Sequence, residues 1–180
     1  MERNVGKTDE VDEIVAAWRR EREDLDASPL EIFSRLLRLN RHLEKFRRQA
    51  FAAHGLDVWE FEMLSLLRRQ GEPYQAQPSQ FMNELLVASG TLTHRINTMV
   101  ERGHAIRHQD SRDRRIKYVR ATPLGIERSD RAMADLLTSE EKMLEPIPHE
   151  DRAEISRILR DLLRPFSDAS KVQTFGATQN

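Results

Sequence analysis

The stretch from Gln77 to Thr122 constrains the fold more than any other part of the chain. It predicts a short helix over residues 78–86, a turn, and a second helix that stops at Gly103, followed by a charged hairpin with SRDRR at its tip. The second helix has an apolar stripe made of Leu92, Ile96, Met99 and Val100. Its opposite side carries small hydrogen-bonding side chains, which suit the edges of base pairs and the phosphates around them.

Positive charge is concentrated in the same stretch. Residues 91–120 hold eight arginines and lysines against three acidic residues, in a chain whose net charge is −1. A localised excess of positive charge is the electrostatic footprint of a nucleic-acid surface. A helix–turn–helix followed by a basic hairpin is typical of a winged helix–turn–helix. In that arrangement the second helix enters the major groove and the wing reaches a neighbouring minor groove.

The wing sequence DSRDRR, residues 110–115, is followed by a returning strand and by Thr122-Pro123-Leu-Gly125. Together with the preceding helix and its stop at Gly103, this segment resembles the recognition helix and wing of the MarR family of dimeric bacterial transcription regulators. The resemblance covers roughly residues 29–164. It implies a mainly α fold with a small β-hairpin wing, dimerised through N- and C-terminal helices. A twofold dimer implies a pseudo-palindromic operator in double-stranded DNA.

Roles can be assigned to individual residues of this unit. Four side chains on the outer face of the second helix are candidates for contact with base edges: Thr91, His94, Asn97 and Thr98. Because a narrow minor groove attracts arginine, three residues at the wing tip are candidates for phosphate and minor-groove contact: Arg112, Arg114 and Arg115. Asp113 is expected to hold the wing turn and its arginines in place, since a carboxylate facing phosphate would be repelled.

Helices are also predicted on both sides of this unit, where Ser28–Glu31 and Asp57–Glu60 each match a capping box. These and other signals predict five segments. Residues 1–27 hold an accessory helix from Asp9 to Arg22 and an arm, residues 28–56 a dimerisation helix, and residues 57–122 the winged helix–turn–helix domain. Residues 123–166 hold C-terminal dimerisation helices, the last of which is expected to end at Pro165, and residues 167–180 a disordered tail. The first and last helices have more apolar positions than a small winged domain can bury, which fits a homodimer.

A second resemblance concerns the signal that such a regulator receives. The N-terminal helix with its tryptophan, the EDLDASPLEIF run, and WEFE followed by THRIN look like the urate-responsive subgroup of the family. This resemblance implies a pocket for a small anionic ligand, urate-like or a carboxylate, bound by Trp18, Glu62, Arg95 and Arg107. Glu62 departs from the subgroup, which has an aspartate at that position.

Arg95 has independent support as a ligand contact. At 100° per residue it lies about 85° from the centre of the apolar stripe, so it flanks the core and need not face DNA. The alternative stays open that Arg95 contacts a phosphate or forms a structural ion pair, with Trp18 serving only in packing.

Composition narrows the classes of function. The chain has no cysteine, which excludes disulfides and thiol-based sensing. An acidic N-terminus, 33% charged residues and no apolar run of about 18 residues predict a cytoplasmic protein that does not enter the membrane. The sequence contains no P-loop, G-x-S-x-G or H-E-x-x-H motif, so it predicts no enzyme, no cofactor and no metal site. The expected function is a repressor released from its operator by the ligand. The alternative is a constitutive DNA-binding regulator or architectural protein without a ligand.

Overall fold

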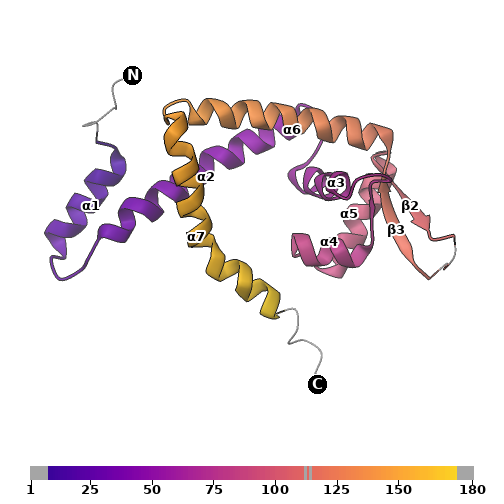
Figure 1. The fold of residues 1–180 in the computed structure, drawn as a ribbon, viewed down its shortest axis with the longest axis horizontal. Coiled ribbons are helices and arrows are strands. Elements are labelled where there is room, and N and C mark those ends of the chain that lie inside the picture. The colour runs from indigo at the N-terminus through magenta and orange to yellow at the C-terminus, as the bar shows by residue number, and fades with distance from the viewer. Residues whose placement is uncertain (1–7, 112, 114, 174–180) are drawn as a thin grey trace. The chain divides into compact units, whose positions relative to one another are not determined.

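The computed structural model describes residues 8–111, 113 and 115–173, with the side chains of 167–173 excepted. Over these residues the chain forms helices and short strands in the order α1, α2, α3, β1, α4, α5, β2, β3, α6, α7 (Figure 1). This is the predicted mainly α fold with a small sheet. The chain divides into two compact units, one up to Thr138 and the other from Ser139 onward.

A helix lies where the sequence predicted one near the N-terminus, α1 (Glu10–Glu21). The side chain of Asp9 caps it by accepting the backbone N–H groups of the first turn. α1 packs on the beginning of α2 (Ser28–Ala52), with Val11 and Val15 buried there. Three sets of ion pairs join the two helices: Arg35 with Asp9 and Asp12, Arg38 with Glu10, and Arg19 with Glu31.

The two predicted capping boxes do not form. At the start of α2 it is Asp26 that accepts the backbone N–H of Ser28, at 2.9 Å, and its hydroxyl, at 3.0 Å. At the start of α3 (Val58–Arg69), Asp57 makes no side-chain cap. Asp57 and Glu60 instead bind the Arg102 guanidinium, at 2.9 and 2.7 Å. Charge-assisted hydrogen bonds are stronger than neutral ones. Asp57 and Glu60 therefore bind Arg102, which is distant in the sequence, in place of the backbone N–H groups of a local cap.

α3 forms the centre of the hydrophobic core. Five of its apolar side chains are at most 3% exposed: Phe61, Met63, Leu64, Leu66 and Leu67. The ring of Phe61 stacks on that of Phe51, at the end of α2, with 3.9 Å between centroids. Burying each such side chain contributes about 1.5–3 kcal/mol, so this helix anchors the elements around it.

The predicted helix–turn–helix consists of α4 (Pro78–Leu85) and α5 (Ser89–Glu101). Pro78 occupies the first turn of α4, where no N–H donor is needed. The left-handed conformation of Leu86, with φ of 51°, turns the chain into α5. Four side chains turn inward from the two helices and are buried: Phe81, Leu92, Ile96 and Met99.

The sheet has one strand more than the hairpin that the sequence predicted. β2 (Ala105–Gln109) pairs antiparallel with β3 (Lys117–Ala121), with Arg107 opposite Val119. β1 (Gln75–Ala76) pairs with the other edge of β3, giving the order β1-β3-β2. A strand of two residues is too short to leave a periodic signal in the sequence.

The last two helices are α6 (Pro123–Leu144) and α7 (His149–Gln173). Thr122 caps α6, since its hydroxyl accepts the Gly125 N–H at 3.1 Å. The prediction that Pro165 ends the last helix is wrong, because Pro165 lies inside α7. Proline removes one backbone donor, and the helix nevertheless continues to Gln173. Residues 174–180 of the predicted tail lie outside the described residues.

Among the described residues, every helix is either too short or too polar to serve as a membrane span.

Candidate nucleic-acid interface

α5 presents one face to the core and the other to solvent. Thr91, His94 and Asn97 are exposed on the outer face, and Thr98 is half-buried. The Thr98 hydroxyl donates to the carbonyl of His94 within the helix, at 3.2 Å. Thr91, His94 and Asn97 therefore keep hydrogen-bonding atoms on the side of the helix that faces away from the protein, as contact with base edges requires.

The wing turn between β2 and β3 is held by two carboxylates. Asp110 accepts the backbone N–H of Asp113 at 3.1 Å, and Asp113 accepts that of Arg115 at 2.9 Å. The Arg115 side chain is 96% exposed, with its Nε 3.8 Å from Asp113. Asp113 is therefore hydrogen-bonded within the turn, and its role in holding the wing stays a prediction. Arg112 and Arg114, also predicted to contact DNA, lie outside the described residues.

One side chain links the wing to α5. Arg107, on β2, donates a hydrogen bond from Nη2 to Oδ1 of Asn97. The sequence predicted separate roles for these residues, Arg107 in ligand binding and Asn97 in base contact. Because they are hydrogen-bonded, a change at one of them is felt directly by the other.

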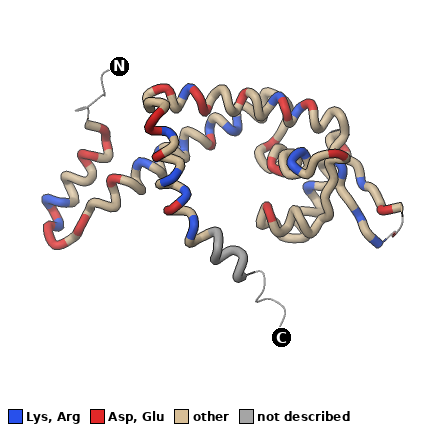
Figure 2. Tube along the Cα trace, in the orientation of Figure 1, with Lys and Arg blue, Asp and Glu red and all other residues tan. Residues whose placement is uncertain are grey.

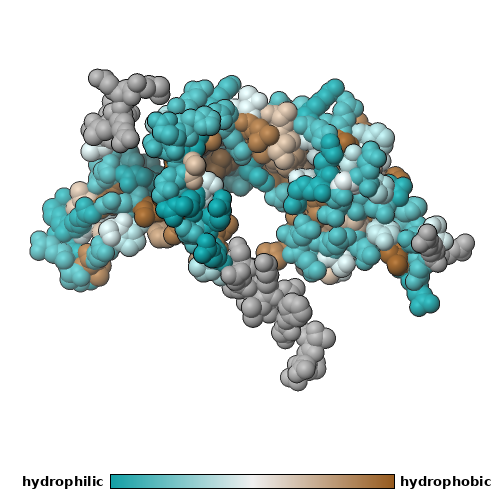
Figure 3. All heavy atoms as spheres, viewed as in Figure 1, coloured by the Kyte–Doolittle hydropathy of each residue, from teal (hydrophilic) through white to brown (hydrophobic). Residues whose placement is uncertain are grey.

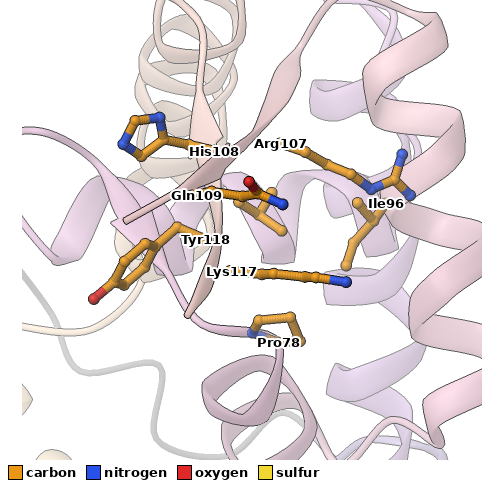
Figure 4. A pocket seen from close by; sticks show the side chains of 8 residues that line it. Pro78, Ile96, Arg107, His108, Gln109, Lys117 and Tyr118 are labelled. Carbon is orange, nitrogen blue, oxygen red and sulfur yellow. The ribbon is translucent and has the colours of Figure 1, made fainter. Parts of the chain in front are cut away.

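A pocket of about 500 Å³ lies between the wing strands, the start of α4 and α5. Strand alternation places Arg107, Gln109 and Lys117 on the side of the sheet that faces Pro78 and α5 (Figure 4). His108 and Tyr118 point to the opposite side (Figure 4). Two cationic side chains, Arg107 and Lys117, therefore reach into a space beside α5.

The basic character of the winged unit is visible along the trace of the wing strands (Figure 2). Not every cation counted in the sequence is available to DNA. Arg120 binds the side chain of Gln75, at 2.6 and 3.0 Å, and Arg102 binds Asp57 and Glu60. Arg95 lies over the ring of Trp59, 5.4 Å from its centroid. These three arginines are engaged by partners in the same chain, so fewer cations are left for phosphate than the sequence suggested.

Comparison with known proteins places this architecture. No protein-family model matches the chain. The HTH-type transcriptional regulator PecS of Dickeya dadantii (strain 3937) is 31% identical over 150 residues, which are 83% of this chain and 90% of PecS. The solved structure of AbsC, a MarR family transcriptional regulator from Streptomyces coelicolor, matches with a TM-score of 0.68 at 20% identity, over 82% of this chain and 97% of AbsC.

The chain belongs to the MarR family of transcriptional regulators. It is therefore a DNA-binding regulator and not an enzyme. The MarR-type fold also matches the organohalide sensing RdhR-CbdbA1625 transcriptional regulator in its 2,4-dichlorophenol bound form. That match has a TM-score of 0.63 at 15% identity and covers 91% of this chain and 89% of RdhR-CbdbA1625.

Three of the four residues predicted to bind a ligand in this MarR-family chain have separate partners. Glu62 binds Arg47 at 3.2 Å, Arg95 lies over Trp59, and Arg107 binds Asn97. Trp18 is 48% exposed on α1, whose ion pairs with α2 involve residues from Glu31 to Arg38. Glu31 and Arg47 are separated by about 24 Å along α2 at 1.5 Å per residue. No hydrogen bond or ion pair between described residues joins any two of the four.

Sequence reasoning missed a buried polar cluster of this MarR-family winged unit. Glu60 is 0% exposed and His104 is 1% exposed. The His104 ring binds Glu60 through Nδ1 at 2.6 Å and meets the Arg128 guanidinium through Nε2 at 3.0 Å. Hydrogen bonds from Arg102 to Asp57 and Glu60 raise the pKa of Arg102. No local sequence pattern signals this cluster, because His104 follows a glycine stop and Glu60 matches a cap.

Proposed function

We propose that this MarR-family protein is a homodimeric repressor that leaves a pseudo-palindromic operator when a small anionic metabolite, urate-like or a carboxylate, binds. One observation carries the ligand part of the proposal. The pocket beside the recognition helix is lined by Arg107 and Lys117, and Arg107 also binds Asn97. An anion that attracts the Arg107 guanidinium competes with Asn97 for it, which links ligand binding to the DNA-facing side of α5.

In the operator complex, the outer face of α5 reads base edges through Thr91, His94, Asn97 and Thr98. Arg115 at the wing tip, with Arg112 and Arg114, neutralises phosphate and enters the minor groove. The exposure of Thr91, His94 and Asn97, together with the projecting Arg115 side chain, supports these roles. Asp113 keeps the wing turn in the shape that presents the arginines.

The homodimer is supported by apolar side chains that reach the surface of a single chain (Figure 3). On α2 they are Ile32, Phe33, Leu37 and Leu39, each at least 49% exposed. On α7 they are Ile155, Ile158, Leu159, Leu162, Leu163 and Phe166, each at least 37% exposed. Exposed apolar surface of this extent marks a protein interface. A twofold dimer offers two recognition helices to two half-sites about one helical turn apart.

Ligand release follows from a difference in affinity between two conformations. The anion displaces the operator only to the extent that it binds the DNA-incompetent conformation more tightly. That RdhR-CbdbA1625 has been solved with 2,4-dichlorophenol bound supports an aromatic effector in a fold of this kind. In this proposal Arg107 meets the anionic group first, and Arg95, Glu62 and Trp18 provide the remaining contacts. The distances along α2 imply that Trp18 moves or comes from the second protomer.

The test is a titration of labelled DNA from upstream of the protein's own gene, at fixed salt, with urate and a panel of small carboxylates. Sequence-specific binding that one compound abolishes supports the proposal. Arg95→Ala is then expected to keep most of the operator affinity and lose the response. Arg131→Ala serves as a control, since Arg131 pairs with Glu127 on α6.

Two outcomes contradict parts of the proposal. Tight binding that no compound disturbs favours a constitutive regulator and removes the ligand roles of Trp18, Glu62, Arg95 and Arg107. A large loss of operator affinity in ligand-free Arg95→Ala instead places Arg95 on the phosphate backbone.

A further inference from the structure

Glu60 and His104 form a buried hydrogen bond in the interior of the DNA-binding unit, away from the surface that faces DNA. Their side chains are 0% and 1% exposed, and Oε1 of Glu60 lies 2.6 Å from Nδ1 of His104. Burying a carboxylate is costly unless its oxygens are satisfied. The second oxygen of Glu60 accepts from Arg102 at 2.7 Å, so both oxygens have donors.

The partners of His104 fix its tautomer. A carboxylate only accepts hydrogen bonds and a guanidinium only donates them. Nδ1 of His104 therefore carries the proton and donates to Glu60. Nε2 uses its lone pair to accept from Nη1 of Arg128, 3.0 Å away on α6. The imidazole thus serves as a bridge from α3 to α6.

The backbone of His104 joins the same elements a second time. Its N–H donates to the carbonyl of Met99 in α5, at 2.8 Å, and its carbonyl accepts the N–H of Thr122 at 3.0 Å. A Cβ atom on Gly125 of α6 would lie 2.2 Å from that carbonyl oxygen. The end of the recognition helix, the base of the wing and the start of α6 therefore meet at this one residue.

We propose that Glu60 and His104 are positioning residues for operator recognition. The chain of contacts Arg102–Glu60–His104–Arg128 sets the angle of α5 and the wing relative to α3 and α6, although neither buried side chain faces DNA. The proposal rests on DNA binding, which is the family's function, and is independent of any ligand. Sequence discrimination needs base edges and side chains in register within a fraction of an ångström, whereas attraction to phosphate tolerates displacement. Loss of the bridge is therefore expected to reduce discrimination more than general DNA affinity.

Three substitutions each break a different contact in the series Arg102–Glu60–His104–Arg128. Glu60→Gln keeps an oxygen for His104 and turns an amide N–H₂ toward Arg102, which breaks that arm. His104→Asn places its amide nitrogen near the Nδ1 position, so it keeps the donor to Glu60 and loses the acceptor for Arg128. Arg128→Gln leaves the buried Glu60–His104 pair whole and weakens only the link to α6, so it stays folded even if a change in the interior does not.

A second histidine–carboxylate pair supplies the matched control. His54 binds Asp135 of α6 through Nε2 at 2.7 Å, and both lie outside the winged surface. His54→Asn withdraws that nitrogen just as His104→Asn withdraws Nε2 from Arg128. A general effect of losing a histidine contact to α6 appears in both variants.

The experiment uses the full chain and a duplex that the wild-type protein selects from a random library, with a scrambled duplex of the same composition. Dissociation constants for both duplexes and the melting temperature are measured for each variant, at a temperature where all are folded. We expect Glu60→Gln and His104→Asn to lower the ratio of selected to scrambled affinity about tenfold, as for residues coupled in one network. Arg128→Gln is expected to lower it about threefold, and His54→Asn not at all.

Unchanged discrimination in folded Glu60→Gln, His104→Asn and Arg128→Gln overturns the proposal. So does a parallel loss of affinity for both duplexes that follows the melting temperature, which is the behaviour of a purely structural contact. Failure of the wild-type protein to select any duplex contradicts the DNA function itself and is distinguished from both. Nitrogen NMR of labelled histidine checks the bridge directly, because a proton on Nε2 of His104 also contradicts it.

Discussion

Gly125 lies at the junction between the wing and α6, where there is no room for a Cβ atom. Its ideal Cβ would lie 2.2 Å from the His104 carbonyl oxygen and 3.0 Å from Leu64, and the first of these is backbone that cannot rotate away. Gly125→Ala is expected to lower the free energy of unfolding by about 2–3 kcal/mol, the upper part of the range for overpacked positions. Urea denaturation at a fixed protein concentration measures it.

Gly90 is the matched control for that prediction. It lies in α5 with nothing within 4 Å of an added Cβ. Gly90→Ala is therefore expected to stabilise by about 0.5 kcal/mol through helix propensity. Equal effects at the two glycines are inconsistent with the close approach at Gly125.

Single residues were predictable from the sequence when their environment is local. The inward stripe of α5 followed from spacing alone, and Leu92, Ile96 and Met99 are buried. Glu60 was misread because its partners Arg102 and His104 are 42 and 44 residues away. A capping box is defined by four consecutive residues, so its pattern contains no information about such partners.

One of the contacts between α1 and α2 uses an ionised carboxylate. Hydrogen bonds from the Arg35 guanidinium lower the pKa of Asp9 from 3.8 to about 2. Because the folded-state pKa is the lower one, the pair stabilises this packing above pH 3.8, and the contribution is lost as the pH falls through about 2. Arg35→Gln is expected to raise the pKa of Asp9 toward 3.8. Carbon NMR of the Asp9 carboxyl group follows the titration. A midpoint near 3.8 in the wild-type protein contradicts the pairing of Asp9 with Arg35.

The wing and the recognition helix are expected to differ in their salt dependence. Removing one phosphate contact changes the slope of log affinity against log salt by about 0.9, so Arg115→Ala, present twice in a dimer, reduces the slope by about 1.8. His94→Ala is expected to leave the slope unchanged and weaken operator binding by about 1–3 kcal/mol per base contact. Affinities measured at several salt concentrations separate the two. An unchanged slope in Arg115→Ala places that side chain away from phosphate.

At the level of elements, the sequence predicted α1, α4, α5 and the wing because each has its own start, stop or periodicity. β1 and the continuation of α7 past Pro165 were missed. β1 exists only through its pairing with β3, and the length of α7 depends on turns beyond a residue that usually stops helices. Both depend on interactions outside the local pattern.

For the whole molecule, the decisive expectation is the dimer. Leu37 of α2 is 66% exposed and Leu163 of α7 is 64% exposed. Leu37→Glu and Leu163→Glu each place a charge on the proposed interface, where desolvation without a partner is costly. We expect both to shift the protein toward monomer in sedimentation equilibrium and to reduce operator affinity. Met82→Glu, an exposed apolar position on α4, should remain dimeric, and dimeric Leu37→Glu and Leu163→Glu variants contradict the interface.

The separation of α5 into a buried face and an outward face has a consequence for how a regulator of this kind can diversify. Thr91 and His94 are exposed and contribute nothing to the core formed by Leu92, Ile96 and Met99. Mutations at the two outward positions therefore leave folding largely intact. After gene duplication, a copy of this protein can acquire a new set of target promoters through a few such changes, while its scaffold stays under separate selection.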